Sequence, residues 1–255
     1  MAASGATADA SSTATVRAHI GGAGSVITAS GGKAELLAGG NNRADATADG
    51  LCIGGIVGLG FISATATASG RTEAYVDSST ELSGGALDVI ASAGDYAAAT
   101  SEAAAGGILG GGNASDAAAN TNPTVEAEIG SHAMVDVGGG VKVHAVSATE
   151  ADAHANGTTL SFGVSGGASD ANVNETSIVR ATVGDGASVT SDGSIEVKAQ
   201  HNEEVDVYDG SFTPNPQIVS TIQDWIQLPG VHGLSTGDRV TYLNGGGDSI
   251  GGLVN

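Results

Sequence analysis

The side chains that could carry chemistry in this chain are few and scattered. Six histidines lie far apart in the sequence, and no two have the spacing typical of metal ligands. His144 and His154 could approach each other on stacked strands, but a coincidental polar face accounts for both. The six are His19, His132, His144, His154, His201 and His232.

Acid–base chemistry on a polysaccharide needs clustered carboxylates, a base and aromatic platforms for the sugar rings. Glu126, Glu128, Lys142 and His144 could line one face of a sheet, yet they occupy ordinary solvent-facing positions. Aromatic residues make up only 3% of the chain, so platforms are scarce. We assign no catalytic, cofactor-binding or metal-ligating residue, and we predict that the chain is not an enzyme.

Glycine-rich runs ending in aspartate are the one feature that bears on a cofactor. A calcium-binding roll would repeat Gly-Gly-x-Gly-x-Asp in tandem. Three segments only approximate this motif, at 111–116, 166–170 and 246–248, and none is repeated in tandem. The runs also lack the lysine and the strand–loop–helix context of a phosphate-binding loop. We therefore expect no cofactor and leave only calcium open.

Charge and apolar content limit the partners. The formal net charge is −20, from 28 acidic and 8 basic residues. Nucleic acids and anionic membranes need Lys and Arg to replace counterions, so neither is expected as a partner. No apolar stretch is long enough to insert into a bilayer. The only cysteine, Cys52, lies in an apolar run and is expected to be a buried thiol.

The apolar residues are mostly small or β-branched. Hydrophobic residues make up 40% of the chain, and there are 42 glycines. Small and β-branched side chains suit a thin interior between two closely spaced sheet faces.

One short segment recurs four times along the first 210 residues. Its last apolar residues are Ile20, Val76, Ile129 and Val183, which are 56, 53 and 54 residues apart. A second segment follows each copy, at Ala34–Ala38, Leu87–Ala91, Val141–Ala145 and Ile195–Ala199. Two segments that recur in step indicate an array of stacked units.

Within each copy, apolar and polar residues alternate, as in Val125–Ile129 and Val141–Ala145. This period of two predicts strands with one buried face and one wet face. Tyr96–Ala105 is richer in consecutive alanines, so a short helix is the alternative to a strand there. Gly138–Gly140 and Asp192-Gly193 are expected at turns, where glycine can take a positive φ without penalty. The glycine-rich apolar stretches, such as Ile53–Phe61, would pass through the tightest part of the coil, where a Cβ would not fit.

These features together predict an all-β fold, a parallel β-helix (β-solenoid) with repeats of about 54 residues. If a coil takes about 20–30 residues, each repeat would make about two coils. The array is expected to span 1–210. A linker with two prolines, Phe212–Pro216, and the start of a small β-module would fill 211–255.

The unit of Val-x-Ala-x-Ile-Gly, then Ala-x-Val-x-x-Gly-Gly, then Val-x-Val-x-Ala resembles the repeats of giant bacterial exoproteins, the filamentous-haemagglutinin-like and leukotoxin-like adhesins. The segment from His232-Gly233-Leu234 to Tyr242 resembles a module of very large secreted bacterial proteins. The resemblance implies a non-catalytic structural or adhesive stalk segment on the cell surface or secreted.

Several expectations follow for location and partners. Met1–Ala10 is polar, so we expect any targeting signal to lie outside this sequence, as part of a longer protein. Host-cell surfaces, polysaccharides or further copies of the chain are the partners considered. The alternative is a carbohydrate-active β-helix enzyme or a polysaccharide-binding module.

Overall fold

The computed structural model describes residues 1–202, 219–220 and 225–226, which form strands and no helix. The chain divides into two units, Met1–Asn202 and Glu203–Asn255. In the second unit, β13 (Val219–Ser220) pairs antiparallel with β14 (Trp225–Ile226). The expected linker at Phe212–Pro216 and the rest of the expected module lie outside the described residues.

The first unit consists of two six-stranded sheets in which every pairing is parallel. The first sheet contains β1 (Ala2–Ile20), β3 (Val57–Val76), β5 (Gly110–Thr121), β6 (Thr124–Ile129), β9 (Val164–Glu175) and β10 (Ile178–Val183). The second sheet contains β2 (Val26–Ile53), β4 (Glu81–Gly107), β7 (Met134–Val137), β8 (Val141–Ser161), β11 (Ser188–Ser191) and β12 (Ile195–His201).

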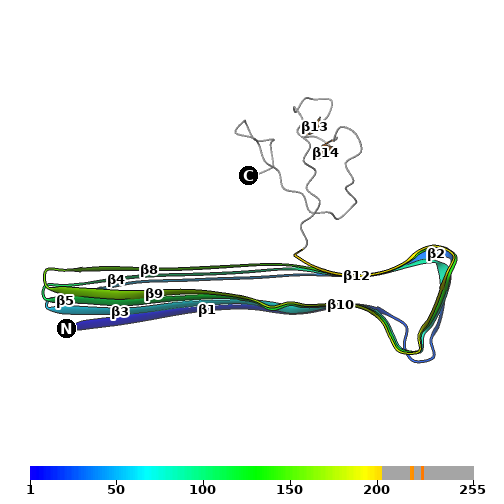
Figure 1. Ribbon diagram of the computed structural model, residues 1–255, viewed down its shortest axis with the longest axis horizontal. Helices are drawn as coiled ribbons and strands as arrows, with labels where there is room; N and C mark the ends of the chain where they lie inside the picture. The colour runs from blue at the N-terminus through cyan, green and yellow to red at the C-terminus, as the bar shows by residue number, and fades with distance from the viewer. Residues whose placement is uncertain (203–218, 221–224, 227–255) are drawn as a thin grey trace. The chain divides into compact units, whose positions relative to one another are not determined.

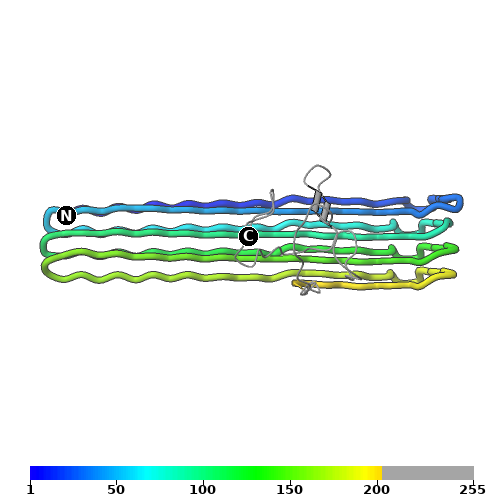
Figure 2. The backbone as a smooth tube through the Cα atoms, turned by 90° about the horizontal axis from the view of Figure 1, so that it is seen from above, coloured from blue at the N-terminus to red at the C-terminus, as the bar shows by residue number. Residues whose placement is uncertain are grey.

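The chain runs along the first sheet, turns, runs back along the second sheet, and then returns beside its earlier strand. We call one such path a circuit, and the four circuits cover 2–53, 57–107, 110–161 and 164–201. Figure 2 shows the circuits lying side by side in sequence order. Their strands are long: β4 has 27 residues, whereas most strands in globular proteins have 3–10.

The expectation that each repeat of about 54 residues makes two coils was wrong. Register partners on neighbouring circuits are 53 to 56 positions apart, as in Asn42 with Asp95 and Arg17 with Glu73. In that interval the chain passes along each sheet once, so about 54 residues make one circuit and not two. Each circuit is therefore broad, because residues that were expected to form two coils form a single one.

The alternation predicted from the sequence is confirmed in the inner circuits. Val125, Ala127 and Ile129 are completely buried, while Glu126 and Glu128 point outward. The same holds along β4, where Tyr96–Ala105 is strand; the short helix that was the alternative there is wrong.

Burial weakens at the two outermost circuits. Among the four residues that end the recurring segment, Val76 and Ile129 are completely buried, and Ile20 packs partly buried against the core. Val183, on the last circuit, is 40% exposed. It is less covered because no described strand lies beyond β10.

The interior changes in thickness along each circuit. One core cluster is built from branched aliphatic residues such as Leu87, Val89 and Val143, and the other is almost entirely alanine, as at Ala66 and Ala99. Figure 1 shows the corresponding shape, with two close layers over most of the length and a wider three-sided section at one end. The alanine side chains allow the two sheets to approach closely, and the larger side chains fill the wide section.

Glycine occupies the inside of the narrow closed end. A Cβ on Gly58 would lie 2.3 Å from the carbonyl oxygen of Gly106, and one on Gly107 would lie 2.2 Å from that of Gly110. The expectation that a Cβ would not fit is confirmed at these positions. It is not general, because a Cβ on Gly55 would meet nothing within 4 Å.

The turn glycines do not adopt the positive φ that glycine would have allowed there. The chain does break between strands at Gly138–Gly140 and at Asp192-Gly193, but none of these residues has a positive φ. Close backbone approach limits two of the glycines: a Cβ on Gly139 would lie 2.4 Å from the carbonyl oxygen of Gly85, and one on Gly193 would lie 2.7 Å from the backbone nitrogen of Gly140. The left-handed residues stack at the wide-end turn, at Gly24, Ser79, His132 and Gly186.

Candidate functional site

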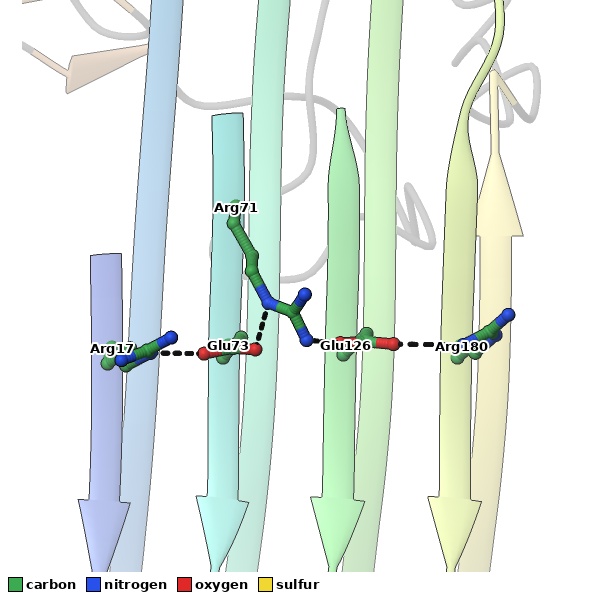
Figure 3. A network of polar contacts seen from close by, with 5 residues as sticks. All are labelled: Arg17, Arg71, Glu73, Glu126 and Arg180. Carbon is green, nitrogen blue, oxygen red and sulfur yellow. Dashed lines mark hydrogen bonds and ion pairs between the residues drawn. The ribbon is translucent and has the colours of Figure 1, made fainter. Parts of the chain in front are cut away.

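A ladder of charged side chains crosses all four circuits on the outer face of the first sheet (Figure 3). Parallel register places Arg17 beside Glu73, Glu73 beside Glu126, and Glu126 beside Arg180. These four residues, together with Arg71, are called the ionic ladder. All of them lie at outward positions of their strands, so register alone brings them into one row.

The ladder uses every carboxylate oxygen that it contains. Glu73 accepts hydrogen bonds from Nε of Arg17 and of Arg71. Glu126 Oε2 accepts one from a terminal guanidinium nitrogen of Arg71 at 2.6 Å, and its Oε1 accepts one from Arg180 at 3.2 Å. Arg71 thus bridges two neighbouring circuits.

This arrangement favours the ionised form of Glu73. Burial of Glu73 acts to raise its pKa, but the hydrogen bonds from Arg17 and Arg71 outweigh burial and leave the pKa below its ordinary value. The guanidinium of Arg71 likewise has a raised pKa because it donates to Glu73. A carboxylate held in this way is a weak base and is deprotonated at neutral pH, so it is poorly suited to general acid–base catalysis.

A second charged group lies on the outer face of the second sheet. Lys33 donates hydrogen bonds to Asp88, at 2.8 Å, and to Glu35. These two carboxylates raise the pKa of Lys33. Here too the ions come from neighbouring circuits, because Glu35 and Asp88 are register partners.

Aromatic side chains take part in similar contacts between circuits. The ring of His19 stacks on that of its register partner Tyr75, with centroids 5.2 Å apart, and its Nδ1 lies 3.0 Å from Asp77 Oδ2. On the other sheet, the guanidinium carbon of Arg43 lies 4.4 Å from the ring centroid of Tyr96. Stacked and cation–π contacts of this kind stabilise a pair without defining a ligand site.

A buried polar pair interrupts the interior. Asp95 Oδ1 accepts hydrogen bonds from the backbone N and from Nδ2 of Asn42, at 3.1 and 2.9 Å. Both residues are only 3% exposed. The pair lies on neighbouring circuits where the branched-aliphatic cluster gives way to the alanine cluster. An aspartate at an inward position was not expected from the sequence.

The structure separates the two histidines that could have approached each other. His144 and His154 both lie on β8, ten residues apart, so roughly 33 Å of extended strand separates them. His144 Nε2 lies 3.3 Å from Glu196 Oε1 on the neighbouring circuit. His232 lies outside the described residues, so the prediction that it ligates no metal stays untested.

Two of the three approximate calcium motifs come together on the first sheet. Asp116 and Asp170 are register partners on β5 and β9, and Ser63 donates to Asp116 at 3.4 Å. The third motif, at 246–248, lies outside the described residues. Within residues 1–202, 219–220 and 225–226 there is no group of three His, Cys, Asp or Glu side chains that could hold a metal ion. Cys52 is buried, as expected.

The sequence contains a signal for the ionic ladder that the alternation of apolar and polar residues does not reveal. When the four recurring segments are aligned on Ile20, Val76, Ile129 and Val183, the residue three positions earlier is Arg17, Glu73, Glu126 or Arg180. Opposite charges at one aligned position indicate ion pairs between stacked strands. This alignment does not reveal Arg71, because Arg71 lies two residues before the aligned Glu73 on β3.

No protein-family model, no curated protein and no solved structure matches this chain. In the described part of the chain, no helix is long and apolar enough to cross a membrane.

Proposed function

We propose that the chain is a structural, non-catalytic segment of a large secreted or cell-surface bacterial protein, built as a parallel β-helix with one coil per circuit of about 54 residues. The main support is the parallel register, which places equivalent residues of successive circuits side by side over four circuits. The apolar interior that runs through neighbouring circuits also supports this architecture. A stack of this kind can carry mechanical load without any reactive group.

The height and width of the circuits indicate which kind of structural element this segment would form. Each added circuit extends the stack by only about 4.8 Å, whereas the 27 residues of β4 reach up to about 90 Å along their path. A coil of 20–30 residues would have made a slim stalk. Circuits of this breadth suit a flat, stiff wall, whose width is set by the long strands and which grows by only about 4.8 Å with each circuit.

The ionic ladder supports a structural role rather than a catalytic one. At its two ends a carboxylate pairs with an arginine of the neighbouring circuit, and in the middle Arg71 bridges the like-charged register partners Glu73 and Glu126. Such contacts favour one register of the stacked strands over a shifted one. The bacterial and cell-surface parts of the proposal depend on the resemblance of 1–210 to exoprotein repeats, for which the comparisons add no match. An adhesive contact with host cells or polysaccharides would use the polar outer faces.

The proposal can be tested by duplicating one circuit. We would insert a second copy of residues 57–109 directly after residue 109, which adds one strand to each sheet. The expected variant folds, keeps its width, and is thicker by about 4.8 Å in electron microscopy and solution scattering. A control insertion of residues 57–80 alone adds half a circuit and should prevent folding, because it reverses the sheet to which each later strand belongs.

Two results would contradict the proposal. If the whole-circuit insertion unfolds as readily as the half-circuit control, the circuits are not interchangeable coils. If the unmodified chain cleaves acidic polysaccharides and Glu126→Gln removes that activity, the carbohydrate-active alternative is correct.

A further inference from the structure

Large exposed hydrophobic side chains gather where the chain passes from the second sheet to the first. Figure 1 shows this turn as the narrow closed end of the circuits. We call these residues the tip stripe. They are between 51 and 97% exposed. The tip stripe consists of Leu51, Ile53, Ile56, Leu59, Phe61, Ile108, Leu109, Leu160, Phe162 and Val164.

The tight interior explains why these side chains point outward. Inside the closed end, a Cβ on Gly54 would lie 2.0 Å from the carbonyl oxygen of Val57, and Gly58 and Gly107 are equally confined. Alternate residues must therefore face water. Polar residues would satisfy that requirement, and they do so elsewhere on the same outer faces, as at Thr65 and Asp116. Folding alone thus gives no reason for leucine, isoleucine and phenylalanine here.

The tip stripe is continuous across the three turns that join the four circuits. Leu109 N donates to Ile56 O at 2.9 Å, and Phe162 N donates to Ile108 O at 3.3 Å, so the turns stack in register. Ten side chains exposing roughly 100 Å² each present on the order of 1,000 Å² of apolar surface. Monomeric proteins rarely expose a patch larger than a few hundred Å², and a standard interface buries about 800 Å² on each partner.

The residues in and around the tip stripe indicate which kind of partner would cover it. Residues 50–62, 104–112 and 158–166 contain no charged residue, no tyrosine and no tryptophan. Among the nearest charged residues along the chain are Asp49, Glu102, Asp116 and Asp170, all acidic. An anionic membrane surface needs basic residues, and a membrane interface favours tyrosine and tryptophan, so a lipid surface is disfavoured.

We propose that two copies of this chain associate tip to tip through the tip stripe. The rows of side chains in both copies have the same spacing of about 4.8 Å, so they can interdigitate along the whole stripe. A symmetric pair buries the same surface on each side and leaves no charge unpaired. The net charge of −20 on each copy opposes association, and salt screens that repulsion.

Sedimentation velocity on the full chain at low and at high salt tests this proposal. We expect a dimer whose fraction increases with salt. The double substitution Ile108→Ser with Phe162→Ser should raise the dissociation constant at least about tenfold, because both side chains lose apolar burial in each copy. Leu37→Ser is the matched control: Leu37 is 59% exposed on β2 but lies outside the tip stripe, so the dimer should be unaffected.

Three outcomes would overturn the proposed tip-to-tip dimer, and none of them bears on the structural function proposed above. The first is a monomer at every salt and protein concentration. The second is a dimer that persists in Phe162→Asp, with far-ultraviolet circular dichroism confirming an unchanged fold, which would place the interface elsewhere. The third is a monomer that co-sediments with neutral phosphatidylcholine vesicles, which would make lipid the occupant.

Discussion

Individual ion pairs in this protein stabilise the contact between circuits. Glu73 is the most enclosed member of the ionic ladder, with its side chain 10% exposed, whereas its arginine partners Arg17 and Arg71 are about half exposed. Exposed ion pairs contribute little, but a carboxylate removed from water depends on its partners. Glu73 is therefore the ladder residue whose charge matters most for folding.

Glu73→Gln should lower the free energy of unfolding by about 1 kcal/mol at neutral pH. The pKa of Glu73 is lowered in the folded state, so its contribution is present above the unfolded pKa of about 4.3 and is lost as the pH falls through the folded value. Urea denaturation of both proteins across this range measures the effect. The two stabilities should converge in acid.

Glu128→Gln is the control for this substitution, since Glu128 is exposed on the same face of the first sheet. It should change stability little at any pH. A difference between Glu73→Gln and the unmodified chain that stays constant down to strong acid would contradict the assigned role of the charge.

Strands in this protein are shaped by the size of their inward side chains. Along each circuit the interior changes from Leu, Ile and Val, through alanine, to glycine at the closed end. The separation of two packed sheets follows the volume of the side chains between them. The same graded sequence in every circuit therefore holds the strands together over a length at which a single strand pair would not be stable.

Gly58→Ala should destabilise the fold by about 1–3 kcal/mol, the usual cost of overpacking. Its Cβ would lie 2.3 Å from the backbone oxygen of Gly106 and 3.0 Å from that of Cys52, and backbone atoms cannot rotate away. Gly55→Ala, three residues earlier, would meet nothing within 4 Å. This control should be neutral, or stabilising by about 0.4–1 kcal/mol through the unfolded state. Thermal unfolding of the pair measures the difference, and equal midpoints would show that the closed end can widen.

The stack as a whole has two edges that differ from its middle. Within the described residues, β1 pairs only with β3, and β9 pairs only with β5. Every residue of β9 is exposed, whereas residues of β5 alternate between buried and partly buried. A parallel edge strand leaves a row of backbone N–H and C=O groups open to further pairing.

Hydrogen exchange measured by mass spectrometry should reveal this difference. Amides in β3, around Ala64–Ala68, should exchange more slowly than amides in β9, around Asp170–Val173, because β3 has partners on both sides. Equal protection in the two strands would mean that another segment or another copy covers the β9 edge. The measurement should be made at low salt, where tip-to-tip association is weakest.

The sequence by itself predicted the all-β fold and the inward and outward faces of the strands in the inner circuits. Both are local patterns: in Val125–Ile129 the alternation of apolar and polar side chains correctly predicts which of them are buried. The row of charged residues in the ionic ladder could also be read from the sequence, because strand register brings the aligned positions together. These residues are Arg17, Glu73, Glu126 and Arg180.

Only the tertiary structure decided how many residues make a circuit and which surfaces are left exposed. The sequence shows where a strand can run, but not whether it continues straight or turns, because alanine and glycine permit both. The same limit applies to the tip stripe: Ile53–Phe61 is apolar in sequence and would be placed inside, yet a two-layer turn has room there only for glycine. Burial of Asp95 beside Asn42 likewise depends on strands 53 residues apart meeting in space.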